Sequence, residues 1–553
     1  MDGLISQPPA PNRFELQPFP AGDILERAVV RFGALPALDF LGRKWTYKQL
    51  GDLANRAAAG LQKLGVMKGV NVGLCLPNSP YYVIMYFAIL KAGGTVVNFN
   101  PLYTEHEIRT QAEQSHTAIM VSMDLRMIHE KIRPLAGDGL FKRVDICRMA
   151  RILTPRDAIL FRLFKGRELS RVANNAPYVP FERLLDSAAL PGAIEIDPLR
   201  DVAVMQFTGG TTGRPKAAML THANVTANVQ QLLATLNGVR EGEERSLAVL
   251  PFFHVFAMTA IMNLGLSCGA ELLLIPRPEI KLITATIRRC RPTVLTGVPT
   301  LFTALSAALE ADTHLSLASV RTYVSGGAPL SAETLDRFER LTQSEILEGY
   351  GLSECSPVVA SSTPGAVRHG AAGRALPGTV IEIRNPEAPH NLLDPGALGE
   401  ICVRGPQVMA GYYHQPEETA QVFIEGALRT GDIGYVDKDG YLFIVDRIKD
   451  LIICGGYNVY PRMIEEAAYL HPAVQDAIAI GVPDPYRGER PKLFVALRPG
   501  KSAEPAEILK FLETYLNKIE LPREVEIRDS LPKTLIGKLS KKELVAEERQ
   551  RAA

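Results

Sequence analysis

The sequence predicts an α/β protein. We expect a large N-terminal domain of helix-covered, mostly parallel sheets with a small β-barrel-like part, followed by a small α+β C-terminal domain. Three observations support this fold class. The chain has 553 residues, more than one hydrophobic core usually organises, so at least two domains are expected. From Trp45 onward, helical patterns alternate with short apolar runs, as in βαβ units. Beyond residue 413 the runs become shorter and more β-like.

The alternation can be followed element by element. We expect helices at residues 46–65 and 79–94 and strands at 71–77 and 95–100. Further strands that end in Gly- or Pro-rich turns are expected at 270–276, 291–299 and 320–330. Such turns, at the carboxyl ends of parallel strands, are where open α/β sheets usually bind ligands.

The C-terminal part of the chain has a different pattern. Short apolar runs at 440–461 and 492–500 flank a helix-and-strand pattern at 461–484, which is typical of a small α+β unit. We therefore place a domain boundary near Lys449, with a large domain at 1–448 and a small domain at 449–553.

Composition argues against several classes of function. The formal net charge is +1, so no overall attraction to nucleic acid is expected, and charged partners must be recruited locally. The seven cysteines are widely spaced and include no C-x-x-C pair, which argues against a disulfide framework or a zinc site. The first 20 residues lack a basic region followed by an apolar stretch, so we expect no secretory signal and a cytoplasmic protein.

One uncharged run, residues 247–270, is long enough to span a bilayer. Pro251, His254 and Asn263 interrupt it and favour a buried loop, helix and turn.

The segment from Lys142 to Arg171 is locally basic. It has nine Lys/Arg against three Asp/Glu, a net charge of +6, and a cluster of Ile, Leu and Phe side chains within 159–164. This composition fits peripheral contact with an anionic membrane, at the inner face for a cytoplasmic protein. It fits equally well a solvated insertion whose apolar side packs on its own domain.

The stretch "FTGGTTGRPKAAMLTH" (residues 207–222) is suited to binding polyphosphate. Its glycines let backbone N–H groups approach a ligand, its threonines add donors, and Lys216 adds a charge. It is not a Walker loop, because Arg214 and Pro215 separate Gly213 from Lys216. Taken alone, it also fits a glycine-rich surface turn.

Four further stretches decide between these interpretations: "LPFFHVF" (250–256), "EGYGLSE" (348–354), "RTGDIGYVDKDGYLFIVDRIKDLI" (429–452) and "PKTLIGKLSKKEL" (532–544). In this order the five motifs resemble those of the adenylate-forming superfamily, which contains acyl-CoA synthetases, adenylation domains and luciferases. The resemblance is greatest to bacterial long-chain fatty-acid–CoA ligases and covers nearly the whole chain. It implies an enzyme that joins a carboxylate to the α-phosphorus of ATP with Mg²⁺, releases pyrophosphate, and passes the acyl group to coenzyme A. It also implies a mobile C-terminal domain.

The resemblance implies roles for individual residues at the nucleotide. The glycine-rich loop would hold the β- and γ-phosphates, Glu354 and Thr208 would hold Mg²⁺, and Asp432 would accept the ribose hydroxyls. Gly209 stands where most relatives have serine, so one hydroxyl donor is lost. The implied ATP- and AMP-binding residues are Thr208, Gly209, Gly210, Thr211, Thr212, Gly213, Lys216, Ser325, Gly326, Gly327, Ala328, Gly349, Tyr350, Gly351, Ser353, Asp432, Arg447 and Lys538.

Catalytic and conformational roles are implied in the same way. Lys538 would stabilise charge at the α-phosphorus, and His254 would orient or shield the acyl group. Glu354 and Arg447 complete the implied catalytic set. Lys449 would be the hinge of the small domain. The channel for the pantetheine arm of coenzyme A would be lined by Gly455, Gly456 and Tyr457.

Each assignment has an ordinary structural alternative when its motif is taken alone. Glu354 fits a helix-capping acid, residues 325–327 fit a strand-to-helix turn, His254 fits a core histidine, and Lys538 fits an exposed tail lysine.

The acid substrate is the least determined feature. Apolar residues 255–267, including Met258 and Ile261, and the turn at 296–302 predict a site for an aliphatic chain, so we expect a medium- or long-chain fatty acid. The alternatives are an aryl-acid–CoA ligase of the 4-coumarate type, an acyl-AMP ligase that loads a carrier protein, and a catalytically silent binding protein. The oligomeric state stays open, with a homodimer as one option.

Overall fold

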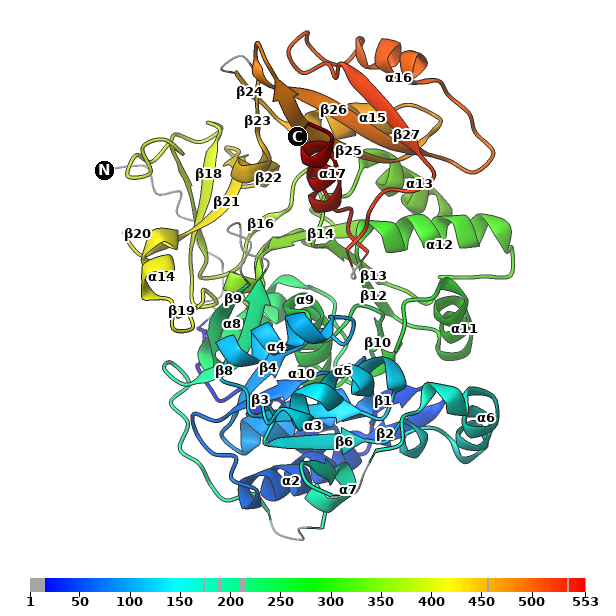
Figure 1. Ribbon diagram of the computed structural model, residues 1–553, viewed down its shortest axis with the longest axis vertical. Coiled ribbons are helices and arrows are strands. Elements are labelled where there is room, and N and C mark those ends of the chain that lie inside the picture. The colour runs from blue at the N-terminus through cyan, green and yellow to red at the C-terminus, as the bar shows by residue number, and fades with distance from the viewer. Residues whose placement is uncertain are drawn as a thin grey trace.

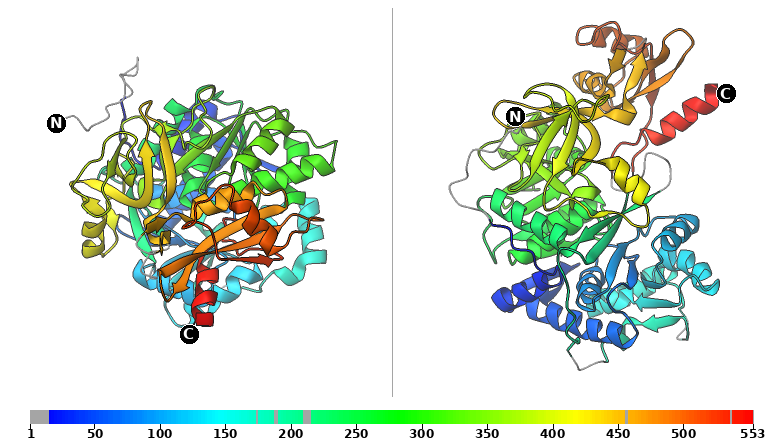
Figure 2. Two further views of the ribbon diagram at one scale, coloured as in Figure 1. Left: turned by 90° about the horizontal axis from the view of Figure 1, so that it is seen from above. Right: turned by 90° about the vertical axis from the view of Figure 1, so that its left-hand side faces the viewer.

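The computed structural model describes residues 15–172, 175–186, 190–208, 215–454, 457–534 and 537–552. Its architecture is the mixed α/β fold that the sequence predicts, with three sheets in a large N-terminal domain and a fourth in a small C-terminal α+β domain (Figures 1 and 2). The small domain is stacked on the large one along the longest axis of the molecule (Figure 1).

The first sheet has eight strands and is parallel from β8 to β7, with β9 and β19 antiparallel at one edge. In spatial order its strands are β19 (Gly411–Tyr412), β9 (Lys216–Thr221), β8 (Val202–Thr208), β4 (Thr95–Asn98), β3 (Asn71–Leu74), β5 (Ile119–Met123), β6 (Arg143–Cys147) and β7 (Tyr178–Pro180). Strands β3, β4 and β6 are buried on both faces, as expected for a parallel sheet covered by helices.

The second sheet has nine strands and is parallel from β14 to β1, with antiparallel strands at both edges. In spatial order its strands are β16 (Arg374–Ala375), β15 (Val358–Ser361), β14 (Ile346–Gly351), β13 (Thr322–Gly326), β12 (Val294–Gly297), β10 (Arg245–Ala248), β11 (Glu271–Leu274), β1 (Pro36–Phe40) and β2 (Arg43–Thr46).

The third and fourth sheets have five strands each. The third is antiparallel and consists of β17 (Val380–Arg384), β18 (Gly399–Arg404), β21 (Ala427–Val436), β20 (Phe423–Ile424) and β22 (Leu442–Arg447). The fourth forms the small domain and consists of β24 (Tyr457–Val459), β23 (Ile452–Cys454), β26 (Gly488–Leu497), β25 (Val474–Asp484) and β27 (Glu524–Arg528). The chain passes from the third sheet to the fourth through η5 (Ile448–Asp450), which contains Lys449.

Seventeen α-helices surround these sheets in the described part of the chain, together with four 3₁₀ turns and one π-helical segment. The α-helices are α1 (Asp23–Phe32), α2 (Tyr47–Lys63), α3 (Pro80–Lys91), α4 (Glu105–Gln114), α5 (Arg126–Gly137), α6 (Pro155–Lys165), α7 (Phe181–Leu184), α8 (His222–Thr235), α9 (Val255–Ala257), α10 (Leu264–Ser267), α11 (Ile280–Cys290), α12 (Pro299–Ala311), α13 (Ala332–Thr342), α14 (Pro416–Val422), α15 (Pro461–Tyr469), α16 (Pro505–Leu512) and α17 (Lys542–Ala552). The short turns are η1 (Met149–Arg151), η2 (Gly166–Glu168) and η4 (Ser353–Cys355) beside η5, and the π-helical segment is η3 (Met258–Asn263).

Local sequence signals explain where several helices begin. Thr46 and Gln49 form a reciprocal capping box at the start of α2, and Thr221 and Asn224 form one at α8. Helix α3 is apolar on every side and buried from Pro80 to Leu90 because it packs between α2 and strands β3 and β4.

The uncharged run at 247–270 is the buried loop, helix and turn that its interrupting residues predict. It forms α9, η3 and α10, and Val255, Met258 and Met262 are fully buried in the main core. In the part of the chain that the structure describes, no helix is both long enough and apolar enough to cross a bilayer.

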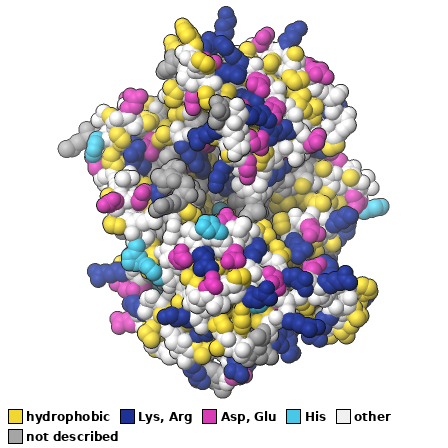
Figure 3. Space-filling model, in the orientation of Figure 1, with side chains coloured by type: hydrophobic (Ala, Val, Ile, Leu, Met, Phe, Trp, Pro, Cys, Tyr) yellow, Lys and Arg dark blue, Asp and Glu magenta, His cyan; other side chains and the backbone are white. Residues whose placement is uncertain are grey.

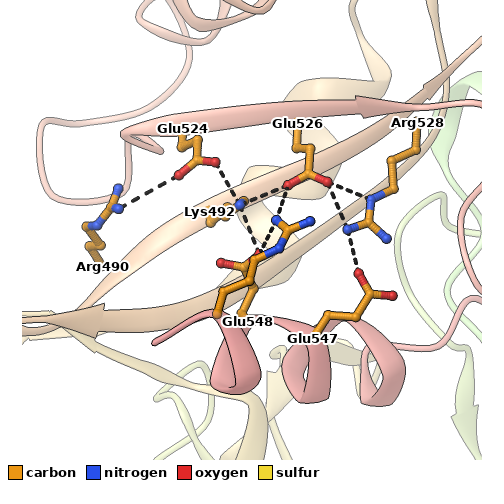
Figure 4. Close-up of polar contacts among 8 residues, drawn as sticks. Arg490, Lys492, Glu524, Glu526, Arg528, Glu547 and Glu548 are labelled. Carbon is orange, nitrogen blue, oxygen red and sulfur yellow. Dashed lines mark hydrogen bonds and ion pairs between the residues drawn. The ribbon is translucent and has the colours of Figure 1, made fainter. Parts of the chain in front are cut away.

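A buried ion-pair network fastens the last strand and helix to the small domain (Figure 4). The ammonium of Lys492, on β26, is 2% exposed and lies 2.7 to 3.0 Å from carboxylates of Glu524 and Glu526 on β27 and Glu548 on α17. Burial alone would raise the pKa of Glu526, but hydrogen bonds from Lys492, Arg551 and Arg528 lower it to about 2. The C-terminal segment that carries the predicted catalytic lysine is thus held in the domain at both ends.

Candidate active site

A cavity of about 1260 Å³ lies between the large and small domains. Thirteen of the residues that the motifs single out line it: Thr208, Lys216, His254, Gly327, Gly349, Tyr350, Gly351, Ser353, Glu354, Asp432, Arg447, Lys449 and Lys538. Gly209, Gly210, Thr211, Thr212, Gly213, Gly455 and Gly456 lie outside the described residues. The cavity thus gathers residues that are as much as 330 positions apart in the chain, Thr208 and Lys538 being the most distant.

A tyrosine, an aspartate and an arginine form a fixed cluster on one wall. The hydroxyl of Tyr350, near the end of β14, donates to Asp432 Oδ2 at 2.6 Å, and Arg447 Nε donates to Asp432 Oδ1 at 3.0 Å. The β21–β22 register places Asp432 directly opposite Arg447. The Asp432 carboxylate raises the pKa of Arg447, and burial together with that carboxylate raises the pKa of Tyr350. Each carboxylate oxygen keeps a second lone pair, so Asp432 is an oriented acceptor for ligand hydroxyls.

The glycines beside this cluster are explained by close packing. A Cβ on Gly351 would lie 2.0 Å from the Pro357 carbonyl oxygen, and one on Gly326 would lie 2.9 Å from the ring of Phe256. Gly327 has φ +80°, and its Cβ would lie 2.8 Å from Lys538 Cε. A side chain at Gly327 would therefore displace the end of the Lys538 side chain and would require a strained backbone. Ser325, Gly326 and Ala328 are not among the lining residues.

Glu354 and Lys216 face the cavity with partners that the sequence did not reveal. Tyr412 donates its hydroxyl to Glu354 Oε1 at 2.9 Å, while the Lys216 ammonium pairs with Glu418 and lies 5.3 Å from the centroid of the Tyr412 ring. A phosphate would have to compete with Glu418 for this ammonium. Residues 412 and 418 carry no motif, so only the fold identifies them.

The carboxylate of Glu354 fits one ligand of a Mg²⁺ ion. In the described ranges, no group of three or more His, Cys, Asp or Glu side chains could hold a metal by itself. Mg²⁺ is usually held at nucleotide sites by one or two carboxylates with phosphate oxygens and water, so the single carboxylate fits an ion that arrives with its nucleotide.

Lys538 and His254 both line the cavity, and the charge of Lys538 acts on His254. Burial, and then the nearby Arg447 guanidinium, lower the pKa of Lys538 to about 8. Burial, and then the Lys538 ammonium, lower the pKa of His254 to about 3, so this imidazole is neutral near pH 7. His254 Nδ1 accepts the Phe256 backbone N–H at 3.3 Å, which leaves Nε2–H as a donor. The site is therefore cationic and has a neutral hydrogen-bond donor.

Part of the cavity lining is apolar and is called the apolar branch below. It consists of Leu232 of α8, Leu236 directly after α8, Ala260 of η3 and Leu264 of α10. The prediction that Met258 and Ile261 line the acyl site is wrong, because both are fully buried and lie outside the lining. Met258 packs toward the first sheet instead, with its sulfur 3.5 Å from Asn98 Nδ2.

The predicted turn at 296–302 contributes little to this wall. Thr296 lines the cavity, whereas Leu301 and Phe302 belong to a separate core cluster. The side-chain amides of Asn98 and Gln206, which also line the cavity, already form hydrogen bonds within the protein. Asn98 Nδ2 donates to Gln206 Oε1 at 3.1 Å, and Gln206 Nε2 donates to the Phe253 carbonyl at 3.2 Å.

Tyr457 lies apart from this cavity. It is 63% exposed at the start of β24 and is not among the lining residues. The orientation of the small domain is held in part by an ion pair between Arg498 and Glu333 of α13.

An apolar branch that opens into a cationic, hydroxyl-accepting chamber beneath a second domain suits an enzyme that activates an acid with a nucleotide. Family comparison gives the same class: residues 25–413 match the AMP-binding enzyme family, and residues 463–538 match the AMP-binding enzyme C-terminal domain. The chain belongs to the AMP-binding enzyme family. It is an AMP-forming acyl- or aryl-CoA ligase, with ATP and coenzyme A as substrates.

Relatives and solved structures are similar over nearly the whole chain. It is 39% identical to a long-chain-fatty-acid–CoA ligase of Bacillus subtilis, over 95% of this chain and 94% of the relative. It is 32% identical to 4-coumarate–CoA ligase 1 of Arabidopsis thaliana, over 97% and 93%. Among crystal structures, ATP-bound MatB from Rhodopseudomonas palustris has a TM-score of 0.83 at 28% identity, over 96% of this chain and 100% of that one. The anthranilate CoA ligase AuaEII with anthranoyl-AMP has a TM-score of 0.82 at 26% identity, over 97% and 98%.

Proposed function

We propose that the acid is a medium- or long-chain fatty acid, which the enzyme converts to acyl-AMP and then to acyl-CoA. The observation that carries this proposal is the apolar branch of the cavity. Helix α8 with the residue that follows it, segment η3 and helix α10 contribute only Leu232, Leu236, Ala260 and Leu264 to its lining. An alkyl chain gains free energy there by leaving water and meets no charge from these elements.

The first half-reaction uses the cationic chamber. A carboxylate oxygen of the acid forms a bond to the α-phosphorus of ATP while the bond from that phosphorus to pyrophosphate breaks. Lys538 stabilises the charge that develops at the phosphorus, and the neutral His254 donates to the carboxylate or shields it from water. Asp432 and Arg447 hold the ribose, and Tyr350 with Gly349, Gly351 and Ser353 borders the adenine.

Phosphate and metal binding complete this half-reaction. We assign the β- and γ-phosphates to Thr208, Lys216 and the loop 209–213, and Mg²⁺ to Glu354 with Thr208 as a second contact. Binding of the triphosphate would draw Lys216 away from Glu418. Mg²⁺ would offset the negative charge of the phosphates when it is bound.

The second half-reaction requires the small domain to turn. The thiol of coenzyme A attacks the acyl carbonyl carbon, and AMP leaves with the electrons of the acyl–phosphate bond. We place the hinge at Lys449, between domains 1–448 and 449–553, and the pantetheine channel at residues 455–457. The exposed position of Tyr457 supports this scheme. The overall TM-score is 0.83 to ATP-bound MatB and 0.74 to apo MatB, which suits a scheme in which nucleotide binding favours one arrangement of the chain.

An aryl acid is the second candidate, and one observation favours it. Gln111 lines the cavity, and its Oε1 is buried without a hydrogen-bond partner among the described residues. A ring hydroxyl could donate to it. The 32% identity to a 4-coumarate–CoA ligase also supports this candidate.

Pyrophosphate release over a panel of acids, with and without coenzyme A, tests the proposal. Each methylene buried in the apolar branch should contribute about 0.8 kcal/mol, or about fourfold in kcat/KM, until the branch ends. We expect efficiency to rise from short to medium or long saturated acids, with 4-coumarate poor. A preference for hydroxycinnamates would support the aryl candidate, and turnover that needs a carrier protein in place of coenzyme A would contradict the proposed acceptor.

A further inference from the structure

Helix α6 (Pro155–Lys165) stands at an edge of the large domain, apart from the small domain (Figures 1 and 2). Its start is well specified: Thr154 accepts the Asp157 backbone N–H at 3.2 Å, and Pro155 occupies the first turn. The helix is therefore a defined element of the surface.

The solvent-facing side of α6 is apolar. Ala158 and Phe161 pack against the core, whereas Ile159 and Leu163, four residues apart on the opposite side, are 61% and 72% exposed. Leu160 and Phe164 flank them, and Phe164 is 82% exposed. A surface helix normally presents polar residues on this side. The expectation that the apolar side of segment 142–171 packs on its own domain thus holds for buried residues before the helix, such as Met149 and Leu153, but within α6 only for Ala158 and Phe161.

Basic side chains surround this apolar side. Arg156, Arg162 and Lys165 are exposed on the helix, and Arg167 and Arg171 follow it. Figure 3 shows the hydrophobic side chains at the lower right edge with Lys and Arg side chains beside them. The segment 142–171 has a net charge of +6 in a chain whose net charge is +1, so the rest of the chain is net negative.

The acidic residues of α6 and η2 offset only part of this rim. Asp157 accepts the Thr154 hydroxyl at 2.7 Å, and Glu168 pairs with Lys165 and Arg277. The exposed face therefore combines large apolar side chains with cations.

We propose that α6 docks the protein on an anionic lipid bilayer. Ile159, Leu163 and Phe164 enter the boundary between headgroups and acyl chains, while the basic rim meets lipid phosphates. A second copy of the chain fits this surface less well, because a two-fold contact would bring the two basic rims together. The inference is independent of the identity of the acid.

Co-sedimentation of the full-length protein with vesicles tests this inference. We compare phosphatidylcholine vesicles with vesicles that also contain phosphatidylglycerol, at low and high salt. We expect binding only to the anionic vesicles, with weaker binding at high salt. The pairs L163S/F164S and R156E/R162E should each reduce the partition coefficient by about tenfold or more, from lost burial and lost attraction respectively. Matched controls are L199S/Y486S and R200E/R240E, which change exposed residues elsewhere.

Thermal melts and turnover of a short, soluble acid should be the same for all variants, since the altered side chains are exposed. Absence of binding to anionic vesicles, equal binding to neutral vesicles, or equal losses in the control pairs would overturn the inference. The inference would also be overturned if the original protein did not bind vesicles but self-associated in light-scattering measurements, and if L163S/F164S removed that self-association.

Discussion

Lys538 gives the sharpest test of the proposed site, because it enters the cavity from the small domain and, in the proposed reaction, acts in one half-reaction only. We expect Lys538→Ala to remove adenylation and to leave thioester formation largely intact. Loss of one positioned donor to a developing charge costs about 10²- to 10³-fold in rate, or about 2.7 to 4 kcal/mol. The Lys538 ammonium is desolvated enough to lower its pKa to about 8. Charges interact more strongly where water is excluded, so we expect the upper end of that range.

Single-turnover assays separate the two half-reactions. Pyrophosphate release without coenzyme A reports adenylation, and acyl-CoA formation from preformed acyl-AMP reports the transfer. Lys501→Ala, at an exposed position of the same domain, is the matched control. If both half-reactions fell equally in Lys538→Ala, the assignment of this lysine to adenylation would be wrong.

The pH dependence gives a second readout of the same residue. Burial and Arg447 lower the pKa of Lys538 from 10.5 to about 8, so its charge is present below about pH 8 and lost above it. The kcat/KM of adenylation for ATP should therefore fall as the pH rises through about 8, because this parameter reports the free enzyme. Lys538→Arg should lack that limb, since a guanidinium stays charged. A flat profile for the original protein from about pH 7 to about pH 10 would contradict the assignment.

Three further changes test other parts of the structure. Lys449→Pro should slow transfer from preformed acyl-AMP more than pyrophosphate release, because it restricts the backbone at the proposed hinge; equal losses would argue against a hinge there. Ala260→Phe should move the optimum of the fatty-acid series to shorter chains without changing the KM for ATP, because the ring fills the apolar branch, and an unchanged optimum would place the alkyl chain elsewhere. Lys492→Met should lower the free energy of unfolding by about 1.5 to 3 kcal/mol, since Glu524, Glu526 and Glu548 lose their shared buried cation and keep only their pairs with Arg490, Arg528 and Arg551; urea titration beside the exposed control Lys501→Met measures this, and equal midpoints would contradict it.

The sequence predicts the fold class well, and the reason is physical. Helical patterns and short continuous apolar runs reflect which faces are buried, and β3, β4, β12 and β13 lie within the predicted ranges. The motif residues also converge. Parallel strands end at one edge of a sheet, which brings Tyr350 near the chamber, and antiparallel pairing sets Asp432 opposite Arg447.

Partners that depend on long-range packing could not be predicted in this way. Glu418 meets Lys216 across 202 residues of sequence, and no local pattern marks Glu418 as the partner of this lysine. The error at Met258 and Ile261 has a similar origin, because apolar composition shows that a segment is buried but not which side faces a cavity. The π-helical turn at η3 directs Ala260 to the branch and Met258 to the first sheet.

The charges of the chamber also bear on how the two half-reactions follow one another. Arg447 and Lys538 repel each other in this orientation, which contributes to the lowered pKa of Lys538. In the proposed reaction a triphosphate between the domains would offset this repulsion and favour the orientation described here. Once pyrophosphate leaves, acyl-AMP retains a single phosphate, so less negative charge opposes the same repulsion. The cations that stabilise adenylation would then favour release of the small domain, and with it the turn about Lys449 that transfer to coenzyme A requires.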